Sequence, residues 1–172
     1  MEEEGFEKFS VYGFSIDYPK VCRIEFNPKS RREGGDVVFH FPDREKLFVT
    51  WGALDKVQTK FPTVEQQAEH TMKNIRKTGN VRNLERVKQD SITVSSHQAA
   101  FNHMTLDEAA RGLFPSKRSM KHDAYSVHLH CTQSSRYFVI YTMLSPNAPP
   151  DFGELYTTIV HSFRCHGSAD RD

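Results

Sequence analysis

The side chains best suited to chemistry in this chain are two histidines in a segment where apolar and polar residues alternate. His128 and His130 stand two positions apart. Because alternate residues of a strand point to the same face, both imidazoles would project together and form half of a metal site. His103 could supply a third ligand if its strand lies beside theirs. With nine histidines in the chain, such spacing also arises by chance, and the alternative is a polar sheet face partly shaded by a helix. We therefore assign no cofactor from the sequence.

Residues 107–123 interrupt the strand pattern and mix basic with apolar side chains. Basic residues around exposed apolar anchors suit an acidic partner surface, because an aromatic ring supplies contact area and arginine supplies charge-assisted hydrogen bonds. The alternative is a hydrophilic hairpin loop whose Leu113 or Phe114 packs back onto the domain. The predicted partner-binding residues are Arg111, Leu113, Phe114, Lys117, Arg118 and Lys121.

The spacing of the cysteines and the lack of known catalytic motifs argue against an enzyme. Cys22, Cys131 and Cys165 are odd in number, far apart and without a CxxC pair, so we expect three reduced, buried thiols rather than a disulfide framework or a zinc ribbon. Cys131 adjoins His130, but neighbours on a strand point to opposite faces and cannot act as nucleophile and base. The chain has no GxSxG, Walker, HExxH or dinucleotide-binding glycine pattern. An enzyme whose site is assembled from distant strands stays open as an alternative.

Length and charge restrict the class of protein further. At 172 residues, the chain is expected to form a single domain over 1–172 with a short polar tail at 167–172. The 23 Lys and Arg residues against 22 Asp and Glu leave a net charge of +1, so we expect no nucleic-acid partner. No apolar run approaches the roughly 20 residues of a membrane span. The acidic N-terminus lacks the features of a signal or transit peptide, which predicts a cytoplasmic location.

The elements that must position these side chains follow from hydrophobic periodicity. Period-two alternation predicts a meander of half-buried strands in the first third of the chain. A helix is predicted at 63–78, because Thr63 and Gln66 form a capping box before an apolar stripe of helical spacing. A second helix is predicted at 151–165, with Asp151 as its cap.

The later strands complete the expected sheet. Strand patterns occupy 83–89, 91–95, 98–106 and 125–131, and a hairpin at Ser134-Ser135 leads into 136–144. Residues 136–144 are apolar on both faces, which predicts a strand at the centre of the sheet with a layer covering each side. About eight strands and two helices therefore predict an α+β fold in which an antiparallel sheet is flanked by helices.

Two local patterns resemble the PsbP-like family. Residues 13–19 read Gly-Phe-Ser-Ile-Asp-Tyr-Pro, which is similar to the family's opening strand, and residues 159–164 read Ile-Val-His-Ser-Phe-Arg, which is similar to its closing helix. The resemblance covers roughly residues 9–166 and implies an α/β/α sandwich. The tryptophan that often follows Tyr-Pro is replaced by Val21-Cys22, and a lipid-bearing cysteine near the start is missing. The photosystem role of plant members is therefore not carried over.

The resemblance also implies a class of function. Members of the family with known roles, including the related factor that binds the nuclear-transport GTPase Ran, act by binding proteins and assisting assemblies. We therefore expect a non-enzymatic domain that binds an unknown protein partner or assists assembly. The first alternative is a carrier of a small ligand or metal ion that uses the sheet face, and the second is an undetected enzyme. The sequence does not indicate the oligomeric state.

Overall fold

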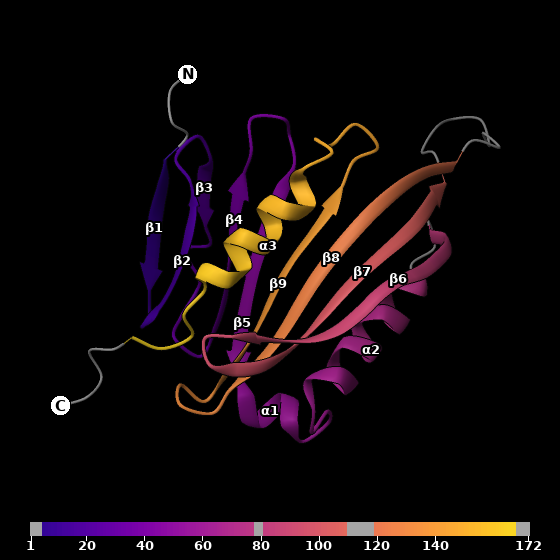
Figure 1. The fold of residues 1–172 in the computed structure, drawn as a ribbon. Helices are drawn as coiled ribbons and strands as arrows, with labels where there is room; N and C mark the ends of the chain where they lie inside the picture. The colour runs from indigo at the N-terminus through magenta and orange to yellow at the C-terminus, as the bar shows by residue number, and fades with distance from the viewer. Residues whose placement is uncertain (1–4, 78–80, 110–118, 168–172) are drawn as a thin grey trace.

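The computed structural model describes residues 5–77, 81–109 and 119–167. These residues form a seven-stranded antiparallel sheet in the order β3-β4-β5-β9-β8-β7-β6 and a two-stranded ribbon of β1 and β2 (Figure 1). The ribbon strands are β1 (Phe6–Val11) and β2 (Phe14–Pro19). The strands of the large sheet are β3 (Arg23–Phe26), β4 (Gly34–His40), β5 (Lys46–Ala53), β6 (Val81–Val94), β7 (His97–Ala109), β8 (Ser119–Cys131) and β9 (Arg136–Leu144).

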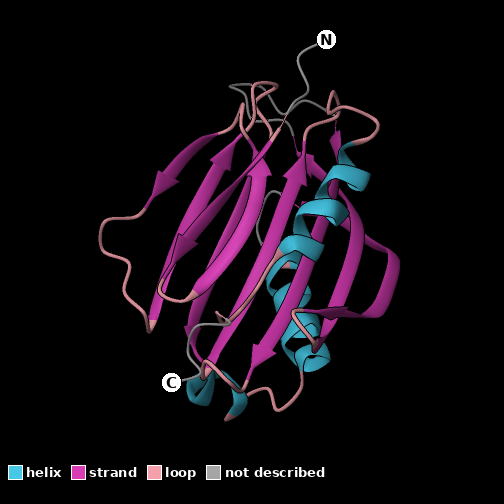
Figure 2. Ribbon diagram, turned by 60° about the vertical axis from the view of Figure 1, so that its left-hand side comes forward, coloured by secondary structure: helices cyan, strands magenta, loops and turns pink. Residues whose placement is uncertain are grey.

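Helices lie on both faces of the large sheet. The helices among the described residues are α1 (Leu54–Gln58), α2 (Val64–Arg76) and α3 (Phe152–Ser162). Helix α3 and the β1–β2 ribbon cover one face, which we call the inner face, whereas α2 lies behind β6, β7 and β8 on the outer face (Figures 1 and 2). This arrangement confirms the expected α+β class. None of the helices in the described part of the chain is long and apolar enough to cross a membrane.

The main core lies between the inner face and α3. Phe152, Tyr156 and Ile159 recur at helical spacing along α3 and are buried. The Tyr156 hydroxyl donates to the carbonyl oxygen of Ile140 on β9 at 2.7 Å, which satisfies the polar end of a fully buried ring. The helix is shorter than the expected 151–165 because it ends at Ser162, and the Asp151 side chain makes no capping hydrogen bond, contrary to our expectation.

Helix α2 begins as the sequence predicts. The Thr63 hydroxyl accepts from the backbone N–H of Gln66 at 3.2 Å, and the Gln66 side-chain oxygen accepts from the backbone N–H of Thr63 at 3.3 Å. This capping box satisfies two backbone donors that the first turn of a helix leaves unpaired.

Replacing Thr63 with alanine should lower the free energy of unfolding by about 1 kcal/mol, because one of these donors then loses its acceptor. Urea unfolding of the variant measures the loss. Thr158→Ala is the matched control, since Thr158 is an exposed threonine inside α3 that makes no capping bond, and it should change stability by less than about 0.5 kcal/mol. Equal losses in the two variants would refute a capping role for Thr63.

Several elements differ from the expected pattern. Strand β1 and the short helix α1 were not predicted from the sequence. The predicted segments 83–89 and 91–95 belong to a single strand, β6, whose pairing with β7 shifts register between Arg86 and Lys88. Strand β8 begins at Ser119, so much of the polar segment before residue 125 is paired strand. Strand β2 pairs with β1 instead of joining the large sheet, because it crosses the inner face beside α3, where Ser15 pairs with Arg164.

Candidate functional site

The central strand β9 has one buried and one uncovered face. Residues 136–144 form the expected strand, and it lies fourth of seven in the sheet. Its inner-facing residues are all buried, but on the outer face Tyr141 is 37% exposed and Met143 is 41% exposed. The expectation that a layer covers each side was therefore wrong for the described chain, because α2 lies over β6–β8 and reaches only the flank of β9.

Apolar side chains of neighbouring strands extend the uncovered surface. Phe48 on β5 lies opposite Tyr141, and their rings stack with centroids 4.9 Å apart and an interplanar angle of 9°. Tyr137 lies opposite Gly52, where any larger side chain would collide with the tyrosine ring. We call this surface the open face, and its residues are Val38, Phe48, Tyr137, Val139, Tyr141 and Met143.

A groove joins the open face to helix α2. Its volume is about 440 Å³, and its walls include Ala68 and Met72 from the helix and Val139 from β9. Asn102 and Ser126 are buried polar residues in its lining. The groove is therefore mainly apolar with a few polar groups, a composition typical of ligand-binding and peptide-binding sites.

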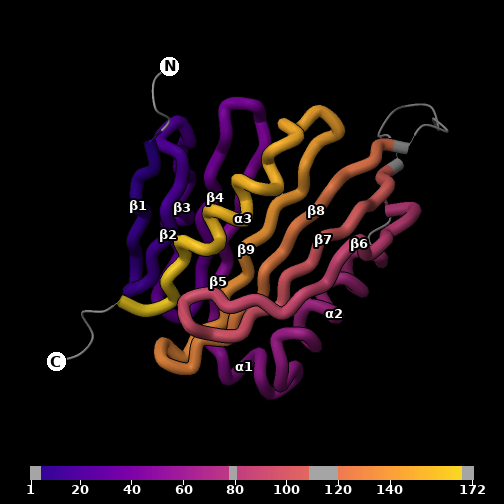
Figure 3. Tube along the Cα trace, in the orientation of Figure 1, coloured from indigo at the N-terminus to yellow at the C-terminus, as the bar shows by residue number. Residues whose placement is uncertain are grey.

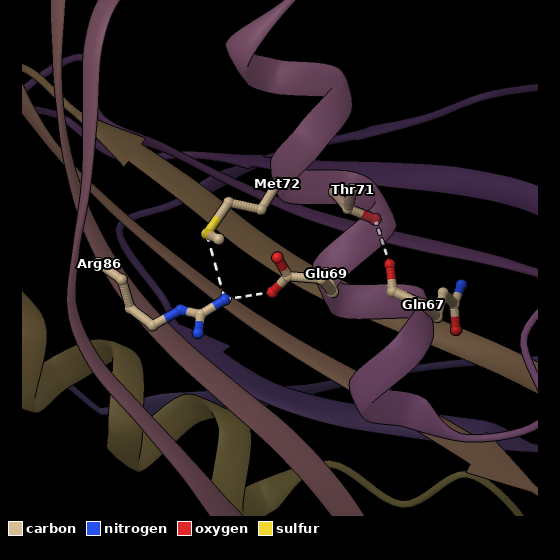
Figure 4. A network of polar contacts seen from close by, with 5 residues as sticks. All are labelled: Gln67, Glu69, Thr71, Met72 and Arg86. Carbon is tan, nitrogen blue, oxygen red and sulfur yellow. Dashed lines mark hydrogen bonds and ion pairs between the residues drawn. The ribbon is translucent and has the colours of Figure 1, made fainter.

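Polar contacts fix the position of α2 at the far wall of the groove (Figure 4). Arg86 on β6 forms an ion pair with Glu69, and the same guanidinium nitrogen lies 3.7 Å from the sulfur of Met72. Within the helix, the Thr71 hydroxyl donates to the carbonyl oxygen of Gln67 at 3.0 Å. The wall formed by Ala68 and Met72 is thus held against the sheet by a side-chain contact as well as by apolar packing.

The three predicted metal-ligating histidines are not brought together. His128 and His130 do share the outer face, as expected, but His103 lies on the inner face, where it bonds to Asp123 at 2.9 Å and stacks on Tyr125. His130 bonds to the side-chain oxygen of Gln67 at 2.8 Å. A metal held jointly by all three histidines is incompatible with this placement, because the sheet itself separates the rings.

His128 lies in an apolar environment beneath α2. Its side chain is fully buried, and neither ring nitrogen has a hydrogen-bond partner in the described structure. Burial lowers the pKa of His128 from 6.5 to about 4, and the neighbouring charge of His130 acts in the same direction. At neutral pH the imidazole is therefore uncharged.

Most of the predicted basic site falls outside the described structure. Arg111, Leu113, Phe114, Lys117 and Arg118 are not among the described residues. Lys121 is described and lies exposed on β8, opposite Asp107 on β7. Partner binding by this segment stays a prediction.

The three cysteines are buried, as expected. Cys131 points to the inner face, away from His130, and its sulfur lies 2.7 Å from that of Cys165. The pKa of the Cys131 thiol is lowered, chiefly because the Cys165 thiol donates a hydrogen bond to it, whereas the same bond and burial raise the pKa of Cys165. Cys131 and Cys165 belong to a group of four potential metal ligands, the one group of three or more that lies close together among the described residues.

Comparison with known structures identifies the fold of this chain. No family model matches the sequence, and none of the curated proteins matches it. The solution structure of cyanobacterial PsbP (CyanoP) from Synechocystis sp. PCC 6803 superimposes with a TM-score of 0.63 over 94% of this chain and 92% of that chain, at 14% identity. A crystal structure from Bacteroides thetaiotaomicron VPI-5482 gives a TM-score of 0.56 at 10% identity and covers 98% of this chain. This chain spans 51% of that protein.

These likenesses establish a PsbP-like fold, as the sequence resemblance implied. At such low identity the likeness carries no residue roles from one protein to another. We did not predict the open face from the sequence, although the small number of predicted helices indicates that such a face exists. Two predicted helices are too few to cover both faces of a sheet with so many strands, so some apolar strand face had to stay uncovered.

Proposed function

We propose that this chain is a protein-binding domain and that its partner contacts the open face. The observation that carries the proposal is the exposure of Tyr141 and Met143, at 37% and 41%, on the central strand of the sheet. A contiguous exposed apolar patch on a folded domain marks an interaction site more often than it serves as bare surface. The proposal narrows the expected non-enzymatic binding role to a defined surface.

The composition of the open face suits a protein partner. Its centre consists of stacked aromatic rings and a methionine, and tyrosine, phenylalanine and methionine are enriched at the centres of protein interfaces. Its border on the edge strand β3 is charged, where Arg23 and Glu25 have largely exposed side chains. An apolar centre with a charged rim is the usual anatomy of a protein interface.

The shape of the surface favours an apolar segment of a protein over a small molecule. The groove beside α2 opens onto the open face instead of closing around a ligand, and together they present residues from β4, β5 and β9. A partner segment could place one apolar side chain in the groove, where it would contact Tyr141 and Met143, and cover Phe48 and Val38 with its neighbours. A small ligand confined to the groove would contact Tyr141 and Met143 but leave Phe48 and Val38 uncovered.

A photo-crosslinking experiment tests this assignment. Benzoylphenylalanine replaces Tyr141 in one variant and Phe6 in the other, because both are exposed aromatic residues, at 37% and 43%, and Phe6 lies on β1 away from the open face. Irradiation in lysate of the native host should produce a discrete protein adduct from position 141. The same adduct should be missing from position 6.

A second variant separates binding from folding. Met143→Lys introduces a charge at an exposed position, so it should change stability by less than about 0.5 kcal/mol and yet remove the adduct formed at position 141. Equal adducts from positions 141 and 6, or an adduct that persists in Met143→Lys, would contradict the proposal. A co-purified apolar small molecule without a protein adduct would favour the small-ligand alternative.

A further inference from the structure

Four metal-binding side chains converge near the end of α3, on the inner side of the sheet. The potential ligand atoms of His97, Cys131, Cys165 and His166 all lie within 4.8 Å of one another. The Nδ1 atom of His166 lies 3.1 Å from the Cys165 sulfur and 3.7 Å from the Cys131 sulfur. The rings of His97 and His166 meet edge to face, with centroids 5.7 Å apart.

The fold brings these residues together from three separate parts of the chain. Ala99 on β7 pairs with Leu129 on β8, so two residues further along the same antiparallel register His97 comes opposite Cys131. Cys165 follows α3, and its backbone N–H donates to the hydroxyl of Ser95 at 3.0 Å. The turn between β6 and β7 thus lies beside the chain that leaves α3 (Figure 3).

The surroundings of the cluster suit a metal site. His97 bonds to the side-chain oxygen of Gln133 at 3.1 Å, which orients the ring as the outer partners of metal-bound histidines do. His166 lines a polar hollow of about 900 Å³, so the cluster borders solvent through this ligand, whereas both cysteines are buried. The buried guanidinium of Arg136 donates to the carbonyl oxygen of Cys165 at 3.3 Å. A positive charge beside thiols favours the thiolate, which is the form that binds a metal.

We propose that His97, Cys131, Cys165 and His166 bind one zinc ion in a tetrahedral Cys2His2 site. Two thiolates and two imidazoles are a standard zinc ligand set, and the group contains no carboxylate, which hard cations such as calcium and magnesium require. On binding, the two thiols release their protons to solvent and their sulfurs bond to the ion. The ion would tie the chain after α3 to the ends of β7 and β8.

The distances specify the movement that binding requires. Zinc bonds to sulfur at about 2.3 Å, so two sulfurs on one tetrahedral ion are about 3.8 Å apart. The observed separation is 2.7 Å, and the sulfurs must therefore move apart by about 1 Å on binding. The site lies on the opposite side of the sheet from the open face, so this inference is independent of the proposed partner surface.

Cobalt(II) titration of the reduced, metal-free protein tests the site, because cobalt reports tetrahedral thiolate coordination by its visible absorption and sulfur-to-cobalt charge-transfer bands. The native chain should bind one cobalt ion with both signals, and zinc should displace it. Cys131→Ser should lose the charge-transfer intensity of one thiolate, and His166→Gln should weaken binding by more than tenfold. Gln133→Ala, which removes the partner of His97, should weaken it by about tenfold.

Cys22→Ser is the matched control, because Cys22 is also a buried cysteine but is not part of the cluster. It should bind cobalt like the native chain. Zinc should raise the midpoint of thermal unfolding of the native chain and of Cys22→Ser equally, and that of His166→Gln by less at the same zinc concentration. His166 is only partly buried, so this variant keeps the test valid even if Cys131→Ser fails to fold. The proposal is overturned if the reduced native chain shows no charge-transfer band, or if Cys22→Ser loses as much binding as His166→Gln.

Discussion

Replacing Phe163 with alanine should lower the free energy of unfolding by about 3–5 kcal/mol. Phe163 follows the last turn of α3 and is completely buried. Its ring lies 4.9 Å from that of Phe138 on β9 and 5.8 Å from that of Phe14 on β2, measured between centroids. Truncation would therefore leave a cavity where the sheet, the ribbon and the end of α3 meet. Chemical denaturation measures the loss.

Phe6→Ala provides the control for this prediction. Phe6 is 43% exposed on β1, so its truncation creates no cavity and should cost less than about 1 kcal/mol. An unchanged unfolding midpoint for Phe163→Ala would show that α3 does not anchor the core through this ring. A loss in Phe6→Ala as large as that in Phe163→Ala would show that burial of the ring does not determine how much unfolding free energy is lost on truncation.

Acidification from pH 7 to pH 4 should destabilise the native chain by roughly 3 kcal/mol more than it destabilises His128→Leu. The pKa of buried His128 is lowered to about 4, against 6.5 for an ordinary histidine. Between these two values the unfolded chain binds a proton that the folded chain does not bind, so stability is lost as the pH falls from 6.5 to 4. The difference of about 2.5 units corresponds to roughly 3 kcal/mol.

The measurement is the free energy of unfolding in urea at several pH values. Leucine has no proton to gain, so His128→Leu should show a flatter dependence on pH, whatever its stability at pH 7. Val127→Ala is the control, because Val127 is buried next to His128 but does not titrate, and it should be less stable at every pH with the native slope. Parallel pH curves for the native chain and His128→Leu would disprove the assigned role of His128.

Local sequence patterns were sufficient for elements that depend on near neighbours in the chain. The capping box at Thr63 and the stripe of α2 involve residues three or four positions apart, and the structure reproduces them. A run that is apolar on both faces likewise identified residues 136–144 as a strand and correctly placed them at the centre of the sheet. The same reasoning separated His130 from Cys131, since adjacent residues of a strand must face opposite ways.

Local patterns could not predict which faces of the sheet the helices cover. The apolar outer side of β9 suggested a layer over it, but a pattern describes what a strand presents and not what lies against it. Tyr141 and Met143 are exposed because α2 packs over β6–β8. The separate pairing of β2 with β1 is another such case, because strand order in a sheet depends on contacts between distant segments.

The sequence by itself determined most of the elements and the α+β class, because backbone geometry converts short-range periodicity directly into helices and strands. The local motifs at 13–19 and 159–164 carried the resemblance to a PsbP-like fold. Only the tertiary structure decided which side chains meet. It put His103 on the opposite face from His128, and it joined His97 to Cys131 through strand register and to Cys165 through the end of α3. The physical reason is that register, strand order and helix docking are set by burial across the whole domain. No local spacing links residues that lie more than thirty positions apart.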